Sequence, residues 1–469
     1  MLKNIHLVGI VILAGLFIFL RFYSLNNSFF FLNDMGRDML VLQKWHDTGK
    51  PPLLGPQTSV MPFNQSAVYF YLLYPGFLLS GGHPISSVYT SAVFYLSFLL
   101  AGYYFLHKDK RLLSTFLISF LLLSIHPQYI LQGRFVWNPS FVTPLVITSV
   151  FAFYLLIQKF TLKKLLVFSS STALAISISY SVTPLLLCFF ILWLIIDRQH
   201  FLKYFIFLIG SLIVLNLPTI FFEIRHNFLL TTSMFTKSPP TISDVVLQQR
   251  YYDLARFVFP TNSQNLSTFL LILSILTCLY LVIKHRKNTH SLVFISSTLY
   301  LLNALITMVF PFPIHSHYIF GFTSLIFLVI STLPTITSAL IVFLFLYNYL
   351  QPAQLETYFQ PAPRTYSQMV SCYTSYCHQF KEPTFVSVQS GILPFHNGPD
   401  HRYALSRSGC KILDIETQNG ASKYMSVIVE SSNFDTKTNY YELDLFGKHK
   451  EINRLNCQPN LEVVTLEKI

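Results

Sequence analysis

Acidic residues are scarce in the first three quarters of this sequence. Only 8 of the 20 Asp and Glu residues lie between residues 1 and 350, where 21 of the 32 Lys and Arg residues lie. The chain also contains neither a P-loop nor a dinucleotide-binding glycine motif. These glycine-rich loops hold nucleotide phosphates, so their absence argues against ATP or NAD chemistry.

Apolar residues, in contrast, are abundant. They make up 52% of the chain, and the mean hydropathy is +0.51, which is typical of an integral membrane protein. The first apolar run has no small-residue cleavage site, so we interpret it as an uncleaved anchor. A shorter run at 66–80 predicts a membrane-surface or re-entrant helix. Eleven runs have spanning length, namely 5–22, 85–106, 112–131, 139–158, 164–181, 182–196, 203–222, 267–283, 291–311, 317–333 and 335–350.

Four basic clusters, at 107–111, 159–164, 197–203 and 284–287, test this topology. With a cytoplasmic N-terminus, eleven spans place all four in the cytoplasm, as the positive-inside rule requires. The same rule explains the net charge of +12 without a nucleic-acid partner. The long loops, about 23–84 and 223–266, then lie outside. We therefore predict a multi-pass protein of the plasma (inner) membrane, with its active site and C-terminus extracytoplasmic.

The composition changes near residue 350, which divides a transmembrane domain at 1–350 from a second domain at 351–469. In the second domain, residues 368–380 are predicted to form a helix. Strands are predicted at 384–389, 425–430, 440–445 and 461–466. The predicted fold class is an all-α polytopic membrane protein of about eleven transmembrane helices, with a small extracytoplasmic C-terminal α/β domain.

The six cysteines fall into two groups. Cys188 and Cys278 lie in predicted spans and are expected to be packing residues. The other four lie outside the membrane, and they predict up to two disulfides with three possible pairings. A metal site is less favoured because no paired CxxC motif is present, and free thiols are the remaining alternative. This second group is Cys372, Cys377, Cys410 and Cys457.

The segment 29–38, directly after the first span, carries Asp34, Arg37 and Asp38 within five residues. Charges at a membrane edge commonly have a functional role. If the segment is helical, the two carboxylates share a face with Arg37 beside them. A general base must be an acceptor that can be positioned and desolvated, and Asp34 is the best placed. The alternative is a solvated helix cap with a local Asp–Arg pair.

Other candidates lie in the remaining outer segments. They include cations and donors that would hold a lipid phosphate leaving group while one carboxylate takes the acceptor proton. Because His315 and His317 lack helical ligand spacing, they give only a weak metal site, and we assign no metal ligand. Trp137 is equally explained as an interface anchor. Candidates for donor phosphate binding are Arg37, Arg134, Arg225, Arg256, His317 and Tyr318. Candidates for an acceptor or sugar pocket are Trp137, Asn138, Glu223 and His226.

Six motifs follow one another along the first 320 residues, at 33–38, 55–59, 69–75, 134–139, 222–227 and 317–318. Their order resembles the GT-C superfamily, in particular the bacterial membrane glycosyltransferases related to protein O-mannosyltransferases and the lipid A aminoarabinose transferase. The resemblance implies inverting transfer of a sugar from a polyprenyl-phosphate donor, with Asp34 as base. Relatives carry an acidic neighbour where this chain has Met35, and Asp38 matches less closely. No cofactor is expected, and a divalent metal is not favoured.

Three other functions compete with this interpretation. A transporter or lipid-sugar flippase should show mid-membrane polar groups and internal repeats, and neither is evident. A structural or binding protein whose function resides in the C-terminal domain should show a recognisable site in that domain, and the sequence of 351–469 shows none. An oligosaccharide polymerase or ligase is a close relative of the first interpretation and stays open. The acceptor, whether glycan, lipid or protein, is not indicated by the sequence.

Overall fold

The computed structural model describes residues 2–58, 64–236, 247–309, 315–390, 398–430, 441–458 and 460–469. The chain forms two compact units, each built from separate segments. The membrane unit comprises Met1–Tyr23, Pro51–Gly76 and Ser87–Phe359. The C-terminal unit comprises Ser24–Lys50, Phe77–Ser86 and Gln360–Ile469. The boundary that the sequence placed near residue 350 assigned 24–50 and 77–86 to the first domain, whereas in the structure these segments pack with the second.

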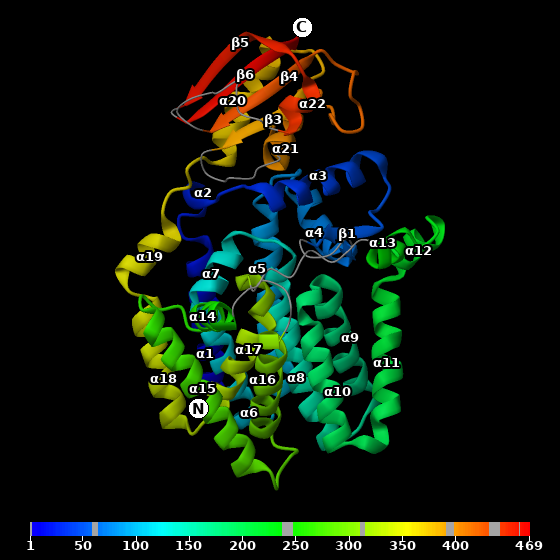
Figure 1. Cartoon of the computed structure of the whole chain (residues 1–469). Helices are drawn as coiled ribbons and strands as arrows, with labels where there is room; N and C mark the ends of the chain where they lie inside the picture. Colours follow the sequence, from blue (N-terminus) through cyan, green and yellow to red (C-terminus); the bar gives the residue numbers. More distant parts are fainter. Residues whose placement is uncertain are drawn as a thin grey trace. The chain divides into compact units, whose positions relative to one another are not determined.

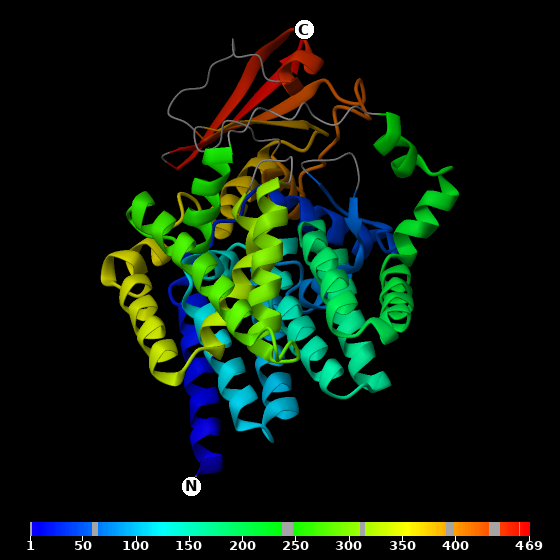
Figure 2. The same ribbon diagram turned by 60° about the horizontal axis from the view of Figure 1, so that its bottom comes forward.

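Helices dominate the membrane unit, and each of the eleven apolar runs holds one or two of them. The bundle formed by α8, α9, α10, α16 and α17 is visible in both views (Figures 1 and 2). Helix α17 is apolar on every side and almost wholly buried, as expected for the centre of a bundle. The helices in these runs are α1 (Leu2–Phe22), α5 (Ser86–Leu106), α6 (Lys110–Ile125), α7 (Pro127–Arg134), α8 (Val142–Gln158), α9 (Leu162–Ile178), α10 (Thr183–Ile196), α11 (Phe201–Leu215), α12 (Leu217–Arg225), α15 (Gln264–His285), α16 (Leu292–Val309), α17 (Phe320–Thr332) and α18 (Thr335–Tyr349).

The number of membrane crossings is smaller by the criterion of length. Five helices in the described residues are long and apolar enough to span a membrane, or up to seven if each of two bent helix pairs counts as one span. A span needs about 20 residues, and α10 and α17 have only 14 and 13. The predicted count of eleven spans is therefore not confirmed. The short run at 66–80 forms α4 (Val68–Leu79), whose place at a membrane surface stays a prediction.

Shorter elements complete the membrane unit. Strands β1 (Leu54–Gln57) and β2 (Asn64–Ser66) form a small antiparallel ladder. The 3-10 helices η1 (Asn138–Phe141), η2 (Tyr180–Val182), η3 (Arg198–His200) and η4 (Ser316–Ile319) precede α8, α10, α11 and α17. The remaining helices are α13 (Leu229–Thr236), α14 (Leu247–Val258) and α19 (Pro352–Phe359).

The C-terminal unit is built on a four-stranded sheet with the order β3-β4-β6-β5 (Figure 1). Strands β3 (Phe385–Ser390) and β4 (Tyr424–Glu430) are parallel, while β6 (Leu461–Lys468) pairs antiparallel with both β4 and β5 (His449–Gln458). Its helices are α2 (Leu25–Ser28), α3 (Asn33–Thr48), α20 (Tyr366–Gln379), α21 (Pro399–Arg407) and α22 (Tyr441–Phe446). The strands predicted at 384–389, 425–430 and 461–466 and the helix at 368–380 are confirmed as β3, β4, β6 and α20.

In the C-terminal unit, one predicted strand is wrong and one strand, β5, was not predicted. Residues 440–445 were predicted as a strand, but 441–446 form α22, which turns Leu443 and Phe446 together into the core beside Val427 and Val464. These two side chains share a helix face because they are three residues apart. Strand β5 lies at the sheet edge with most residues exposed, so it lacks the apolar alternation that reveals a strand.

The cysteines are arranged as two disulfides, Cys372–Cys457 and Cys377–Cys410. This arrangement settles which of the three pairings occurs. Cys188 and Cys278 are free and buried in α10 and α15, as expected for packing residues.

Candidate functional site

The acidic motif lies at the start of α3 in the C-terminal unit. Leu32 is extended, and Asn33 follows with φ of 24°, so the helix begins abruptly and carries Asp34 in its first turn. A negative charge there is favourable beside the helix N-terminus. Nη1 of Arg37 donates to Oδ1 of Asp34 at 2.6 Å, while its Nε and Nη2 donate to Oδ1 of Asp38 at 2.9 and 2.8 Å. The structure thus brings the three charged side chains of the motif together.

The two carboxylates differ in exposure. The side chains of Asp34 and Arg37 are each 32% exposed, whereas that of Asp38 is 1% exposed. A general base must come within hydrogen-bonding reach of the proton that it removes. The carboxylate of Asp34 is accessible on the surface of its unit, and that of Asp38 is not. Asp38 is instead placed to hold the guanidinium of Arg37.

The opposite face of α3 packs on α21 of the same unit. Gly36 faces this contact so closely that a Cβ atom would collide with the backbone of Pro399 and Asp400. Met35 and Met39 are buried on the same side of α3. Glycine is therefore required at residue 36 by the close approach of two backbones. The acidic motif is fixed to the C-terminal domain by this contact, although more than 350 residues separate them in sequence.

A buried charged cluster lies around Arg364, whose side chain is 2% exposed. Its guanidinium contacts Oδ2 of Asp400 at 2.5 Å, Glu430, and the carbonyl oxygen of Phe31 at 2.9 Å. A buried ion pair is favourable only when its geometry is good and its remaining polar atoms are hydrogen-bonded. In this cluster one arginine joins the segment before α3 to α21 and β4.

His401 completes the cluster. Its Nε2 lies 3.1 Å from Oε1 of Glu430, and its Nδ1 lies 2.5 Å from the hydroxyl of Tyr373. Burial opposes ionisation of Glu430, but the hydrogen bond from His401 and the charges of His401 and Arg364 outweigh it, so the pKa of Glu430 lies well below its usual range. These residues were not predicted from the sequence. The only signal was an acidic residue, Glu430, at the end of an apolar strand, and no spacing linked it to its partners.

Arg134, in the membrane unit, was predicted to bind phosphate. In the structure its side chain is buried at the end of α7, where Nη1 donates to the carbonyl oxygen of Arg21 at 2.9 Å and Nη2 to that of Tyr23 at 3.1 Å. Its guanidinium also lies over the ring of Phe359, 5.1 Å from the centroid. These contacts satisfy carbonyl groups that the end of α1 leaves without helical partners. The geometry fits a structural role, and phosphate binding by Arg134 stays a prediction.

Glu223, predicted for the sugar pocket, lies at the end of α12. Its carboxylate accepts hydrogen bonds from the backbone N–H groups of Leu230 and Thr231, both at 2.9 Å, and from the Thr231 hydroxyl at 2.6 Å. Burial by itself would raise the pKa of Glu223. These hydrogen bonds and the charge of His226 lower the pKa by more, so it lies below its ordinary value. Glu223 therefore caps α13. Arg225 and His226 are exposed beside it.

Trp137 and His317 meet in the membrane unit, with ring centroids 4.4 Å apart. Tyr318 lies beside His317, with centroids 4.1 Å apart. The described contacts join Trp137 to His317 but join neither to Glu223 or His226. The residues at 311–314 that precede this histidine segment lie outside the described residues.

Two other predicted residues have separate positions. Asn138 is buried and donates to Oε1 of Gln65 and to the carbonyl oxygen of Ile178, both at 2.9 Å, so it ties η1 to β2 and α9. Arg256 is exposed on α14. Among the residues that the structure describes, no group of three or more His, Cys, Asp or Glu side chains is arranged to hold a metal ion.

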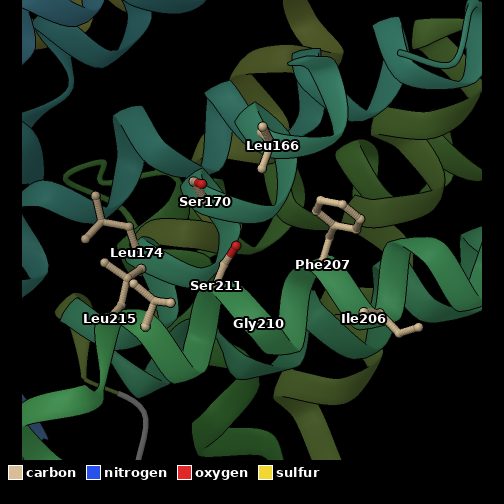
Figure 3. A pocket seen from close by; sticks show the side chains of 9 residues that line it. Leu166, Ser170, Leu174, Ile206, Phe207, Gly210, Ser211 and Leu215 are labelled. Atoms are coloured by element: carbon tan, nitrogen blue, oxygen red, sulfur yellow. The ribbon is translucent and has the colours of Figure 1, made fainter. Parts of the chain in front are cut away.

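A groove of about 520 Å³ lies between α9 and α11 of the membrane unit (Figure 3). Leu166 and Leu174 line one side, Phe207 and Leu215 the other, and the only side-chain oxygens are those of Ser170 and Ser211. No titratable side chain lines the groove. It can accommodate an apolar chain, but it offers no group for acid–base chemistry.

Searches against protein-family models and against curated protein sequences found no match. Among solved structures, the chain is similar to the crystal structure of ArnT from Cupriavidus metallidurans bound to undecaprenyl phosphate. The two chains are 12% identical, the likeness covers 97% of each, and the TM-score is 0.62. This likeness shows that the chain has the GT-C fold, as the sequence motifs indicated. The chain is therefore a multi-pass membrane protein with a small C-terminal sheet domain.

Proposed function

We propose that this chain is a membrane glycosyltransferase that moves a sugar from a polyprenyl-phosphate donor to an acceptor at the outer face of the membrane. One observation carries the proposal. Asp34 is a half-exposed carboxylate, paired with an equally exposed arginine, on a helix whose other face is firmly packed. The GT-C fold supports it, as does the undecaprenyl phosphate bound to the similar ArnT structure.

The proposed reaction transfers one proton and releases one leaving group. The acceptor hydroxyl attacks the anomeric carbon of the sugar, and its proton passes to the carboxylate of Asp34. The bond between that carbon and the phosphate oxygen breaks, and its electron pair leaves on polyprenyl phosphate. Attack from the face opposite the leaving group inverts the anomeric centre, as the resemblance implies. No cofactor and no metal is assigned a step.

Positive groups would stabilise the charge that develops on the leaving phosphate. Arg37 is the best placed of the candidates, because its side chain is 32% exposed and its guanidinium adjoins Asp34. Arg225 and Arg256 are also exposed, and His317 is accompanied by Tyr318. These five residues remain candidates for the phosphate, with Trp137 and His226 as candidates for the sugar or acceptor. Arg134, Asn138 and Glu223 stay predictions, although their contacts fit structural roles.

The extracytoplasmic placement is part of the same proposal. Two disulfides in the C-terminal unit support it, because disulfides persist in oxidising compartments and are rare in the cytosol. We accordingly place the C-terminal unit, with Asp34, on the outer side of the plasma (inner) membrane.

The test is release of free polyprenyl phosphate by the purified protein. A panel of polyprenyl-phosphate sugars would be supplied with a crude envelope extract as acceptor, for wild type and for Asp34→Asn. The proposal expects release by wild type and a loss of about 10³-fold in Asp34→Asn, since a positioned general base contributes factors of this order. The variant should retain its membrane insertion and its thermal unfolding temperature.

Two outcomes would change the assignment. Full activity in a folded Asp34→Asn would remove Asp34 from the mechanism. No release by folded wild type with any donor would favour a flippase, or a polymerase or ligase that uses a diphosphate-linked oligosaccharide.

A further inference from the structure

We propose that Arg364 is a positioning residue for the carboxylate of Asp34, acting through the segment that precedes α3. The inference rests on the proposed function, because it concerns the same carboxylate. It is drawn from contacts inside the C-terminal unit alone. The sequence analysis assigned no site to residues 351–469, so a role for Arg364 extends the machinery into the C-terminal domain.

The side chain of Arg364 reaches the segment that leads into α3. Nη1 of Arg364 donates to the carbonyl oxygen of Phe31, three residues before Asp34, at 2.9 Å. The same guanidinium lies over the ring of Phe30, 5.2 Å from its centroid. Arg364 thus holds two successive residues of the segment that leads into α3. Because Asn33 has a positive φ and Leu32 makes no side-chain cap, the start of α3 depends on such outside contacts.

Arg364 is itself held rigidly by buried partners. Arg364 is clamped by Asp400 and Glu430, which are themselves 0% and 1% exposed. His401 contacts Glu430 at 3.1 Å and Tyr373 at 2.5 Å, so residues of α20, α21 and β4 all converge on the cluster. Charged groups that are buried and mutually hydrogen-bonded have one favourable arrangement. The carbonyl of Phe31 is therefore held against a fixed point.

A backbone contact at Gly36 locates α3 from a second side. Helix α3 and α21 approach so closely there that a Cβ atom would collide with Pro399 and Asp400. Asp400 belongs both to this contact and to the charged cluster. The first turn of α3 is thus located from two sides, by the cluster at Phe31 and by the backbone contact at Gly36. Asp34 lies between these two points, which fixes its carboxylate relative to the C-terminal domain.

The test replaces the cluster by neutral residues of similar shape in Arg364→Met/Asp400→Asn/Glu430→Gln. Neutralising all three charges avoids the unpaired buried charge that a single substitution would leave. The matched control is Arg454→Met/Glu451→Gln/Glu462→Gln, which removes one arginine and two carboxylates from an exposed cluster of the same sheet. Both proteins are purified as full chains, and disulfide formation is checked by mass spectrometry.

Two measurements are made on each protein. Hydrogen exchange should be about tenfold faster at residues 29–38 in the neutral-cluster variant, because local opening is less costly when an anchor is lost. The kcat for polyprenyl phosphate release should fall by about 10- to 100-fold, with the donor KM within about twofold, since misplacing a reacting group mainly affects the transition state. The control should match wild type in both.

A folded neutral-cluster variant that exchanges and turns over like wild type would overturn the inference. If that variant does not fold, Gly36→Ala tests the same point without touching a charge, with Gly15→Ala as control, since nothing lies within 4 Å of a Cβ atom at Gly15. Faster exchange at 29–38 with a reduced kcat supports the inference, and wild-type values in Gly36→Ala oppose it. Faster exchange in a protein whose wild type releases no polyprenyl phosphate would overturn the proposed function while supporting the anchoring.

Discussion

Two carboxylates one helical turn apart on α3 have different surroundings. Asp34 is 32% exposed and Asp38 1%, yet both contact the same arginine. Their spacing follows from the sequence, since residues i and i+4 share a helix face. Their exposure follows from the packing around α3. Chemistry that needs an accessible base therefore distinguishes Asp34 from Asp38, in line with the preference for Asp34 that the sequence indicated.

Asp38→Asn should lower kcat by about 10- to 100-fold, which is less than the loss expected for Asp34→Asn. The substitution disturbs the position of Arg37 but leaves the base in place. It should also lower the thermal unfolding temperature more than Asp34→Asn, since a buried charge pair loses one partner. Rates of polyprenyl phosphate release and unfolding temperatures of both variants check this. Equal loss of activity in the two variants, with equal stability, would contradict it.

The depressed pKa of Glu430 predicts acid sensitivity of the folded state. The pKa of Glu430 in the folded state lies below the unfolded value of about 4.3. The ionised Glu430 therefore contributes fully to the free energy of unfolding above about pH 4.3, and this contribution is lost as the pH falls below that value. Thermal unfolding of the full chain between about pH 7 and pH 3 measures this. Glu430→Gln should be less stable at neutral pH and less sensitive to acid. An unchanged acid sensitivity in this variant would exclude Glu430 as its source.

At the scale of the elements, helix ends in the membrane unit are satisfied by side chains from other helices. Glu223 of α12 caps the beginning of α13, and Arg134 of α7 covers the end of α1. Both residues were predicted from sequence as ligands of substrate. The polar groups at a helix end need partners when they are removed from water, and long charged side chains supply them. Sequence alone does not separate this role from substrate binding.

Arg134→Ala should destabilise the protein by about 3 kcal/mol, because the carbonyl groups at the end of α1 lose a charged donor. The structural role predicts a lower thermal unfolding temperature with little change in donor KM. Arg286→Ala, at an exposed arginine after α15, is the control and should leave both quantities unchanged. A raised donor KM at unchanged stability would instead support the phosphate role that the sequence analysis assigned to Arg134.

At the scale of the whole molecule, the two units are interleaved in sequence. Residues 24–50 and 77–86 pack with the last 110 residues of the chain, although each lies between membrane segments. The C-terminal unit is further closed by two disulfides with sequence separations of 85 and 33 residues. Disulfides restrict the unfolded chain, and the longer loop gives the larger effect in the chain-entropy account. The unit that carries Asp34 therefore depends on long-range closure.

Removing Cys377–Cys410 by the double substitution Cys377→Ser/Cys410→Ser should destabilise the C-terminal unit by about 2–4 kcal/mol. Hydrogen exchange should rise in α20 and α21, and the helices of the membrane unit should be unaffected. The control replaces the buried free thiols, Cys188→Ala/Cys278→Ala, which closes no loop. Unchanged exchange in α20 and α21 after loss of the disulfide would contradict the prediction.

The sequence by itself indicated the helices that lie in the apolar runs, three of the four strands of the C-terminal sheet, and the face shared by Asp34, Arg37 and Asp38. These features are local: apolar runs, strand alternation and i, i+4 spacing are set by neighbours along the chain. Local patterns failed where the context decides, as in 441–446, whose Leu443 and Phe446 reach the core from a helix, and in the exposed edge strand β5.

Only the tertiary structure decided how the charged side chains are used. It buried Asp38 and left Asp34 partly exposed, directed Arg134 and Glu223 to helix ends, and paired the four cysteines of the C-terminal unit. It also joined Arg364 to Asp400 and Glu430 beneath the acidic motif. The exposure of a charged side chain and the pairing of two residues depend on which segments of the chain pack together. Local sequence patterns do not determine contacts between residues that are far apart in the chain.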